Sequence, residues 1–414
     1  MSEHSASAPP SEWRTGWPIV LIGFLGITFA TMHAYSLGVM IGPIEQAQGW
    51  TRAQISSGLM IASFIGVVMA PVIGMGIDRH GPRVIAMVGS LLFCGMFALL
   101  ALTTTDIWSW RGLWVGVALG QSFVTPTVWT AAISSCFARN RGMAQALALS
   151  GTGAGIGVMP ILMTLFVDAV GWRHAFIAMG ASWAILLVPL VFFLFRTPAD
   201  QPRPKASANK APAALPGLTV QNGFRSRAFY LLSAAAVVYA FALSGVTINM
   251  VPVLISLGVA SHTAASLAGA MAIGVMIGRL AAGYMFDRVN ARFVVGFGIA
   301  LSSIPAMILL FLPGSVTLTT LAVFIYGFLL GPSISGFAFL ATQHFGLRSF
   351  GTLFGVVIGL LSLASGLAPV LVNHVYDVTH SYHPVLAGAI VGSLVTAALF
   401  LMLGEYPDFK NEAD

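Results

Sequence analysis

The sequence predicts an all-α integral membrane protein in which twelve transmembrane helices form two pseudo-symmetric six-helix bundles. Three observations support this fold class. The 414-residue chain is 57% hydrophobic and 8% charged, with a mean hydropathy of +0.89, so it has too few polar side chains to cover the surface of a soluble domain. Its apolar stretches are about 20 residues or longer, which suits spanning helices and not the segments of about 10 residues that build a barrel. The two halves of the chain also repeat each other.

The repeat is clearest in a short charged motif. The pair Asp78-Arg79 recurs as Asp287-Arg288, 209 positions later. The same offset superimposes further residues of the two halves: Gly142 on Gly351, Gly157 on Gly366 and Pro160 on Pro369. A duplicated helical unit in so apolar a chain is typical of a secondary transporter whose substrate lies between the two halves.

Twelve apolar stretches follow one another along the chain. The polar residues 1–16 contain no apolar core, so we expect a tail there and no cleavable signal peptide. The N-terminal bundle is expected at 17–195, with helices at 17–43, 54–77, 84–105, 108–136, 143–168 and 175–195. A Pro/Ala-rich linker containing six Lys and Arg residues follows at 196–227. The C-terminal bundle is expected at 228–403, with helices at 228–257, 262–286, 293–313, 316–344, 351–376 and 382–403, before a second tail at 404–414.

The Lys and Arg residues predict the orientation in the membrane. If the N-terminus lies inside, fifteen of the nineteen fall in cytoplasmic segments, and only Arg52, Arg111 and Arg173 fall outside. We therefore expect both termini in the cytoplasm and the chain in the inner (plasma) membrane. Because most of the Lys and Arg residues fall in segments on one side of the membrane, the topology accounts for the net charge of +6, which therefore does not indicate nucleic-acid binding.

The loop after the second expected helix resembles the signature loop of the major facilitator superfamily. It reads Gly74-x-x-x-Asp78-Arg79-x-Gly81-x-Arg83, and the resemblance extends over essentially the whole chain. Within the superfamily, three segments are similar to the branch of monocarboxylate transporters and oxalate/formate exchangers: residues 42–56, 141–160 and 171–176. The resemblance implies a twelve-helix transporter fold.

Charged residues of the two repeated loops are candidates for controlling the inner gate. Asp78 and Asp287 lie at the inner ends of helices, where a carboxylate can pair with a neighbouring Arg or face the positive N-terminus of a helix. We therefore predict a gating role for Asp78, Arg79, Arg83, Asp287 and Arg288. A simple helix cap or turn is the alternative.

Arg279 is the one strongly placed charge inside the membrane. It precedes Asp287 by eight residues, so it lies about 12 Å from the inner boundary of an apolar core about 30 Å thick. An unpaired Arg at that depth costs at least about 2.5 kcal/mol, so it should face a partner or a wet cavity. Where monocarboxylate transporters place the Asp that pairs with their helix 8 Arg, this chain has Val275.

The missing carboxylate makes an organic anion the natural counter-ion for the Arg279 guanidinium, because a guanidinium fork matches a carboxylate. A structural Arg bonded to backbone carbonyls is the alternative. The helix 11 Lys of oxalate/formate exchangers has no counterpart between Gly351 and Pro369. One cation fits a monoanion better than a dianion.

Two polar residues of the first expected helix are further candidates. Tyr35 falls where monocarboxylate transporters place a helix 1 Lys, so their cationic proton site is absent here. His33 could carry a coupling proton instead, because histidine titrates near neutrality. A neutral, hydrogen-bonded histidine in a helix interface is equally common. Five other polar residues can line a central cavity or form interhelical hydrogen bonds: Gln121, Tyr239, Asn249, Tyr326 and Ser362.

No enzyme signature is present in the sequence. It contains no Walker loop, nucleophile elbow or metal-ligand cluster, so we predict no ATP drive, no enzyme activity and no cofactor. The favoured function is proton-coupled symport of a small monocarboxylate by a monomer, with Arg279 binding the carboxylate and Tyr35 and His33 nearby. The alternatives are exchange of organic anions, which needs no protonatable site, efflux of amphipathic compounds, and nutrient sensing without transport.

Overall fold

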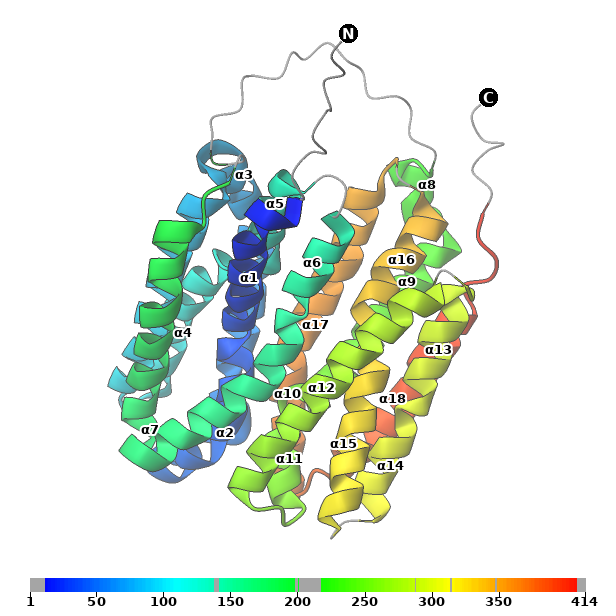
Figure 1. The fold of residues 1–414 in the computed structure, drawn as a ribbon. Coiled ribbons are helices and arrows are strands. Elements are labelled where there is room, and N and C mark those ends of the chain that lie inside the picture. Colours follow the sequence, from blue (N-terminus) through cyan, green and yellow to red (C-terminus); the bar gives the residue numbers. More distant parts are fainter. Residues whose placement is uncertain are drawn as a thin grey trace.

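The computed structural model describes residues 12–137, 141–197, 200, 217–286, 288–312, 315–346 and 348–407. These residues form helices joined by short turns (Figure 1). Their one extended pairing is an isolated antiparallel bridge between Gly217 and Gly346. The predicted all-α membrane fold is confirmed, since long apolar helices account for nearly all of the described chain.

The first half of the chain, as we use the term, comprises α1 to α7. Its elements are α1 (Glu12–Ala30), α2 (Met32–Gln48), α3 (Arg52–Leu99), the 3-10 turn η1 (Leu100–Leu102), α4 (Ile107–Ser122), α5 (Pro126–Cys136), α6 (Arg141–Leu149) and α7 (Gly151–Leu194). Helix α5 restarts at Pro126, which takes the first helical position, where its missing N–H would have no partner anyway.

Glycine interrupts the two longest helices of this half. Gly81 in α3 has φ 78°, and Gly171 in α7 has φ 74°, a backbone conformation that other residues rarely adopt. Two helices meet at each of these glycines. The breaks therefore fall between the expected segments 54–77 and 84–105, and between 143–168 and 175–195.

The second half comprises α8 to α18. Its elements are α8 (Val220–Arg225), α9 (Arg227–Tyr239), the π-helical segment η3 (Ala240–Ser244), α10 (Gly245–Ile248), α11 (Met250–Ser256), α12 (Ser261–Phe286), α13 (Ala291–Leu301), α14 (Ser303–Phe311), α15 (Val316–Leu330), α16 (Ser333–Phe345), α17 (Phe350–Thr379) and α18 (His383–Leu401).

The count of twelve spans and the bundle boundaries stay predictions. The described residues contain nine helical stretches that are long and apolar enough to cross a membrane. Two of these, Arg52–Leu102 and Gly142–Leu194, include the glycine breaks, and α4 and α5 are each too short to be counted. Helix α1 begins before the expected residue 17, and α8 lies inside the expected linker. Most of that linker and of both expected tails falls outside the described residues.

The helices run between two ends of the molecule. Figure 1 shows α5 and α8 at its upper end, while α2 and α11 reach its lower end. We name the two ends after the glycine breaks in α3 and α7, as the Gly81 end and the Gly171 end. The label of α3 stands at the upper end of Figure 1 and the label of α7 at the lower end. The two halves contact each other mainly through two helix pairs, α3 with α17 and α7 with α12.

Buried aromatic rings fill the interior of the first half. Phe93, Trp110 and Trp114 are fully buried, and the ring centroids of Trp110 and Trp114 lie 5.7 Å apart in an edge-on arrangement, which aromatic rings favour. Trp110 also donates from Nε1 to the backbone oxygen of Ile55 at 3.0 Å. This packing holds α3 against α4.

Candidate functional site

Arg279 lies on α12 where this helix contacts the first half. Its Nη1 donates to the backbone oxygen of Leu149, 2.8 Å away, and to Oγ1 of Thr152, 3.0 Å away. Leu149 ends α6 and Thr152 lies in the first turn of α7, so the guanidinium joins the two halves. Among the described residues, no carboxylate lies within ion-pair distance of Arg279, and its Nε and Nη2 have no hydrogen-bond partner.

Three of the predicted tyrosines gather near this guanidinium. Tyr35 on α2 and Tyr239 at the end of α9 both interact electrostatically with Arg279. Tyr326 on α15 interacts with Tyr239, while its hydroxyl donates to the backbone oxygen of Leu243 at 3.3 Å. Leu243 belongs to η3, and π-helical segments are frequent at functional sites. The group around Arg279 thus draws on both halves of the chain.

Two glycines of α7 allow α12 to approach closely. A Cβ atom at Gly153 would lie 2.7 Å from Cγ of Met276, and one at Gly157 would lie 3.0 Å from Cβ of Ala272. Both distances are shorter than ordinary carbon contacts. At Gly157 the added atom would meet α12 itself and push it, and Arg279 with it, away from α7, whereas at Gly153 the Met276 side chain would have to shift.

His33 packs into the interior of the first half. Its Nδ1 lies 3.1 Å from the backbone oxygen of Ala30, and its ring meets those of Phe93 and Trp114 edge-on, with centroid distances of 5.9 and 6.4 Å. Since a carbonyl oxygen only accepts, Nδ1 carries the hydrogen in this contact. None of these described contacts is with Arg279 or with the tyrosines near it.

The other predicted lining residues are dispersed. Asn249, between α10 and α11, accepts at Oδ1 from Nδ2 of Asn373 at 2.8 Å, so it belongs to a polar group on α17. Gln121 lies on α4 beside Gly66 of α3. Ser362 is half-buried on α17 and has no side-chain hydrogen bond to a described residue.

Two of the predicted gating residues form contacts that do not join the two halves. The backbone N of Arg83 donates to Oδ1 of Asp200 at 2.9 Å, and its guanidinium donates to the backbone oxygen of Phe192. The Arg288 guanidinium lies 3.6 Å from the ring centroid of Tyr284 on the preceding turn of chain. Both sets of contacts lie at the Gly81 end.

The remaining gating predictions concern the repeated Asp-Arg pairs. Asp78 and Arg79 are exposed just before the Gly81 turn. Asp287 lies outside the described residues.

A set of polar contacts that was not predicted joins the halves at the Gly171 end. Asp377, near the end of α17, accepts hydrogen bonds from the backbone N of Arg52 and of Ala53, each at 2.9 Å. The Tyr382 hydroxyl donates to Oδ1 of Asn373 at 2.7 Å and accepts from Nη1 of Arg52 at 3.2 Å. Burial raises the pKa of Tyr382 to about 12, so the hydroxyl keeps its proton and remains a donor near neutral pH.

Sequence patterns could have located only one side of this contact. Thr51-x-x-Gln54 is a capping box, a pattern that marks the start of α3. The partner, Asp377, lies 325 positions after Arg52, and no local pattern connects them.

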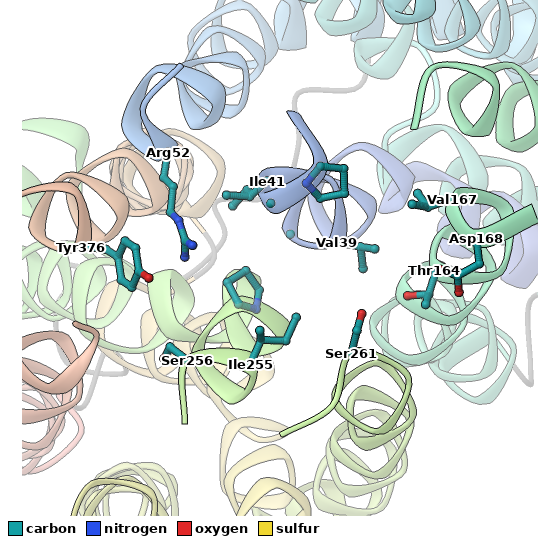
Figure 2. Close-up of a pocket in the computed structure, with 14 residues that line it drawn as sticks. Val39, Ile41, Arg52, Thr164, Val167, Asp168, Ile255, Ser256, Ser261 and Tyr376 are labelled. Atoms are coloured by element: carbon teal, nitrogen blue, oxygen red, sulfur yellow. The ribbon is translucent and has the colours of Figure 1, made fainter. Parts of the chain in front are cut away.

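A pocket of about 360 Å³ opens beside these contacts (Figure 2). Arg52 and Tyr376 lie on one side of it, and Thr164 and Asp168 lie on the opposite side. Its walls come from α2, α3 and α7 of the first half and from α11, α12 and α17 of the second. None of the predicted substrate-binding residues lines it. Among the described residues, the one guanidinium that lines the pocket, that of Arg52, is already bonded to Glu45 and Tyr382. We therefore assign the pocket to the crevice between the halves and not to the site at Arg279.

A comparison with protein families decides the class of this molecule. The family model described as Major Facilitator Superfamily matches residues 23–369. The chain belongs to the major facilitator superfamily. The predicted family and transporter fold are therefore confirmed.

Known relatives of this major facilitator are distant in sequence. The chain is 26% identical to human monocarboxylate transporter 11 over 304 residues, which cover 70% of this chain and 59% of the human protein. It is 25% identical to the 4-hydroxybenzoate transporter PcaK of Acinetobacter baylyi, over 86% of this chain and 87% of that protein. The match thus spans little more than half of the human transporter and most of the bacterial one.

Solved major facilitator structures share the fold. A bacterial homologue of the human lysosomal transporter Spinster, in an inward-facing and unoccupied conformation, superimposes with a TM-score of 0.68 at 19% identity and covers 96% of both chains. A mutant of the nucleoside transporter NupG superimposes with a TM-score of 0.74 at 13% identity, over 94% of this chain and all of that one. Within the described residues of this major facilitator, no group of three or more His, Cys, Asp or Glu is placed to hold a metal ion.

Proposed function

We propose that this major facilitator is a secondary transporter of small organic carboxylates, with Arg279 as the ligand of the carboxylate. The observation that carries the proposal is the state of the guanidinium. It lies between the halves, Nη1 is held by Leu149 and Thr152, and Nε and Nη2 have no partner among the described residues. Two parallel N–H donors on one edge of a guanidinium are the arrangement that binds a carboxylate at both oxygens.

The surroundings of Arg279 support an anion as the occupant. No described acid neutralises the guanidinium, and the nearby Tyr35 and Tyr239 can donate further hydrogen bonds to a carboxylate. The names of two relatives, a monocarboxylate transporter and a 4-hydroxybenzoate transporter, point to the same class of substrate. A single cation favours a monocarboxylate over a dicarboxylate.

The proposed mode of coupling is symport with a proton, for which His33 is the candidate carrier. Exchange of one organic anion for another is the second candidate, and two observations favour it. The His33 ring contacts Phe93 and Trp114 inside the first half, and no described carboxylate accompanies Arg279. Anion exchange needs no protonatable residue.

The proposed placement is the inner membrane, with both termini and the Gly81 end facing the cytoplasm. In that orientation Asp78, Arg79, Arg83 and Arg288 lie on the cytoplasmic side as the proposed residues of an inner gate, and Asp287, outside the described residues, stays a candidate from the sequence alone. The contacts described between the halves, from Arg279 to Asp377, then lie at the middle and the outer side of the membrane. This arrangement corresponds to a conformer that is closed toward the outside.

Flux measurements on purified protein in liposomes test the proposal. Labelled monocarboxylates and dicarboxylates are offered with and without an imposed pH gradient, and with and without unlabelled anion inside. Uphill uptake driven by the gradient supports symport, and uptake that requires internal anion supports exchange. Absence of flux and of binding for every carboxylate would remove the proposal and leave drug efflux or nutrient sensing to be tested.

A further inference from the structure

The carboxylate of Asp377 completes the N-terminal cap of a helix in the other half of the molecule. Thr51 caps α3 by accepting at Oγ1 from the backbone N of Gln54. The Gln54 side chain in turn accepts at Oε1 from the backbone N of Thr51. The N–H groups of Arg52 and Ala53, the first two of the helix, point instead to Oδ1 and Oδ2 of Asp377.

This contact is well suited to hold the halves together. The first N–H groups of a helix have no partner inside the helix, and the helix dipole adds positive potential at that position. A carboxylate that accepts from two of them makes charge-assisted hydrogen bonds, which are stronger than neutral ones. If α3 and α17 separate, both hydrogen bonds are lost, and the two N–H groups and the carboxylate must bond to water instead.

Other contacts lie next to the Asp377 contact, in the same interface between the halves. The Arg52 guanidinium donates from Nε to Glu45 at 3.0 Å and lies 3.7 Å from the ring centroid of Tyr376. Deeper in the interface, Asn373 donates to the Ser56 hydroxyl at 2.7 Å, and both side chains are fully buried. The described ion pair that joins the two halves, His262 with Asp168, is largely exposed and contributes little.

We infer that Asp377 sets the conformational equilibrium of this transporter by latching the Gly171 end closed. The contacts described for Arg83 and Arg288 at the Gly81 end do not join the two halves, so these two residues provide no described counterpart of the latch. Loss of the Asp377 carboxylate shifts the protein toward conformers in which the Gly171 end is open. The inference rests on the proposed function as a secondary transporter, whose two halves move relative to each other to open either end in turn, and is independent of the proposed substrate.

A labelling experiment tests the latch without any substrate. Thr164 lines the pocket at the Gly171 end and is 3% exposed, so Thr164→Cys, made in a Cys94→Ala, Cys136→Ala background, reports the opening of that end. The rate of reaction with a small polar maleimide is measured on purified full-length protein well below its melting temperature. Asp377→Ala should raise the rate about tenfold, which corresponds to about 1.4 kcal/mol. Asp377→Glu, which keeps the carboxylate, should restore a rate close to the parent.

Two controls separate a latch from a general loss of stability. Asp106 also caps a helix with its carboxylate, accepting from the backbone N of Trp108 at 3.0 Å, but entirely within the first half, so Asp106→Ala should leave the labelling of Thr164→Cys unchanged. The native Cys94 is buried inside the first half and, retained in place of the reporter, should stay unreactive in Asp377→Ala. The latch is refuted if Asp377→Ala leaves the reporter rate unchanged, or if it exposes Cys94 to the same extent. The flux assay fails or succeeds independently of these rates.

Discussion

The guanidinium of Arg279 donates to the hydroxyl of Thr152 over 3.0 Å and so connects α12 of the second half to α7 of the first. Under the proposed function, the group that binds the carboxylate also holds the two halves together. The proposed carboxylate binds at Nε and Nη2 of the guanidinium that Nη1 ties to Thr152 and Leu149, so its affinity differs between conformers that keep this contact and conformers that break it. A ligand changes a conformational equilibrium only through such a difference between states.

Replacing Arg279 by Gln or Lys should abolish carboxylate binding. Gln removes the charge, and Lys keeps the charge but loses the planar fork that matches a carboxylate. We expect affinity to fall by at least about tenfold in both variants, measured by calorimetry and by uptake into liposomes. Arg111→Gln is the matched control, because that guanidinium lies against Trp108, 4.9 Å from its ring centroid, and makes no contact with the Arg279 group. Retained affinity in Arg279→Gln would assign this residue to structure alone.

Thr152→Val should lower stability more than it lowers substrate affinity. The change removes one acceptor of Nη1 while the Leu149 carbonyl remains, at a cost of about 1 kcal/mol. The unpartnered Nε and Nη2 are untouched, so carboxylate affinity should stay within about threefold of the parent. Melting temperature and affinity are measured on the same preparation, with Thr152→Ser as a control that keeps the hydroxyl. An affinity loss as large as that of Arg279→Gln would show that Thr152 orients the guanidinium for the substrate.

Gly157→Val should separate α7 from α12. A Cβ at this position lies 3.0 Å from that of Ala272, and a branched side chain needs more room still, so overpacking should cost about 1–3 kcal/mol. Gly142→Val is the control, since a Cβ there meets nothing within 4 Å. Thermal unfolding in detergent compares the two variants, and equal melting temperatures would contradict close packing at Gly157.

Tyr382→Phe should destabilise the protein where Tyr376→Phe does not. The Tyr382 hydroxyl bonds to both Asn373 and Arg52, and its loss leaves a buried amide oxygen without its donor, at about 1 kcal/mol or more. Tyr376 contacts Arg52 through its ring, which phenylalanine preserves. The difference in melting temperature between the two variants measures the hydroxyl contact, and no difference would exclude it as a stabilising element.

His33→Gln distinguishes the two modes of coupling. If His33 carries the proton, uptake driven by a pH gradient should stop while exchange of labelled for unlabelled anion continues. If the protein is an exchanger, both activities should match the parent, because the described contacts of the ring, with Phe93, Trp114 and the backbone oxygen of Ala30, are structural ones within the first half. Both fluxes are measured in the same liposomes, and the folded state of the variant is checked by its melting temperature.

The sequence predicts the fold and the neighbourhood of Arg279 because both depend on hydropathy and depth in the membrane. It does not predict helix rotation. His33 and Tyr35 are two positions apart, which is about 200° around a helix, so one cavity cannot receive both side chains. In the structure Tyr35 approaches Arg279, whereas His33 faces the aromatic interior of the first half.

Contacts between residues far apart in the chain are the second feature that the sequence does not predict. The pairing of Asp377 with the start of α3 joins residues 325 positions apart, and it depends on the relative position of two helices from different halves. Composition places Asp377 only at a helix end. The carboxylate becomes informative once the N–H groups that face it are known.

The covalent connection between the halves is anchored on both sides. On the first half, Asp200 is held by the backbone of Arg83, and on the second, the bridge between Gly217 and Gly346 ties the start of α8 to the end of α16. Each end of the connection is held by contacts outside the interface between the halves, so the contacts described across that interface, such as those of Arg279 and Asp377, are all noncovalent.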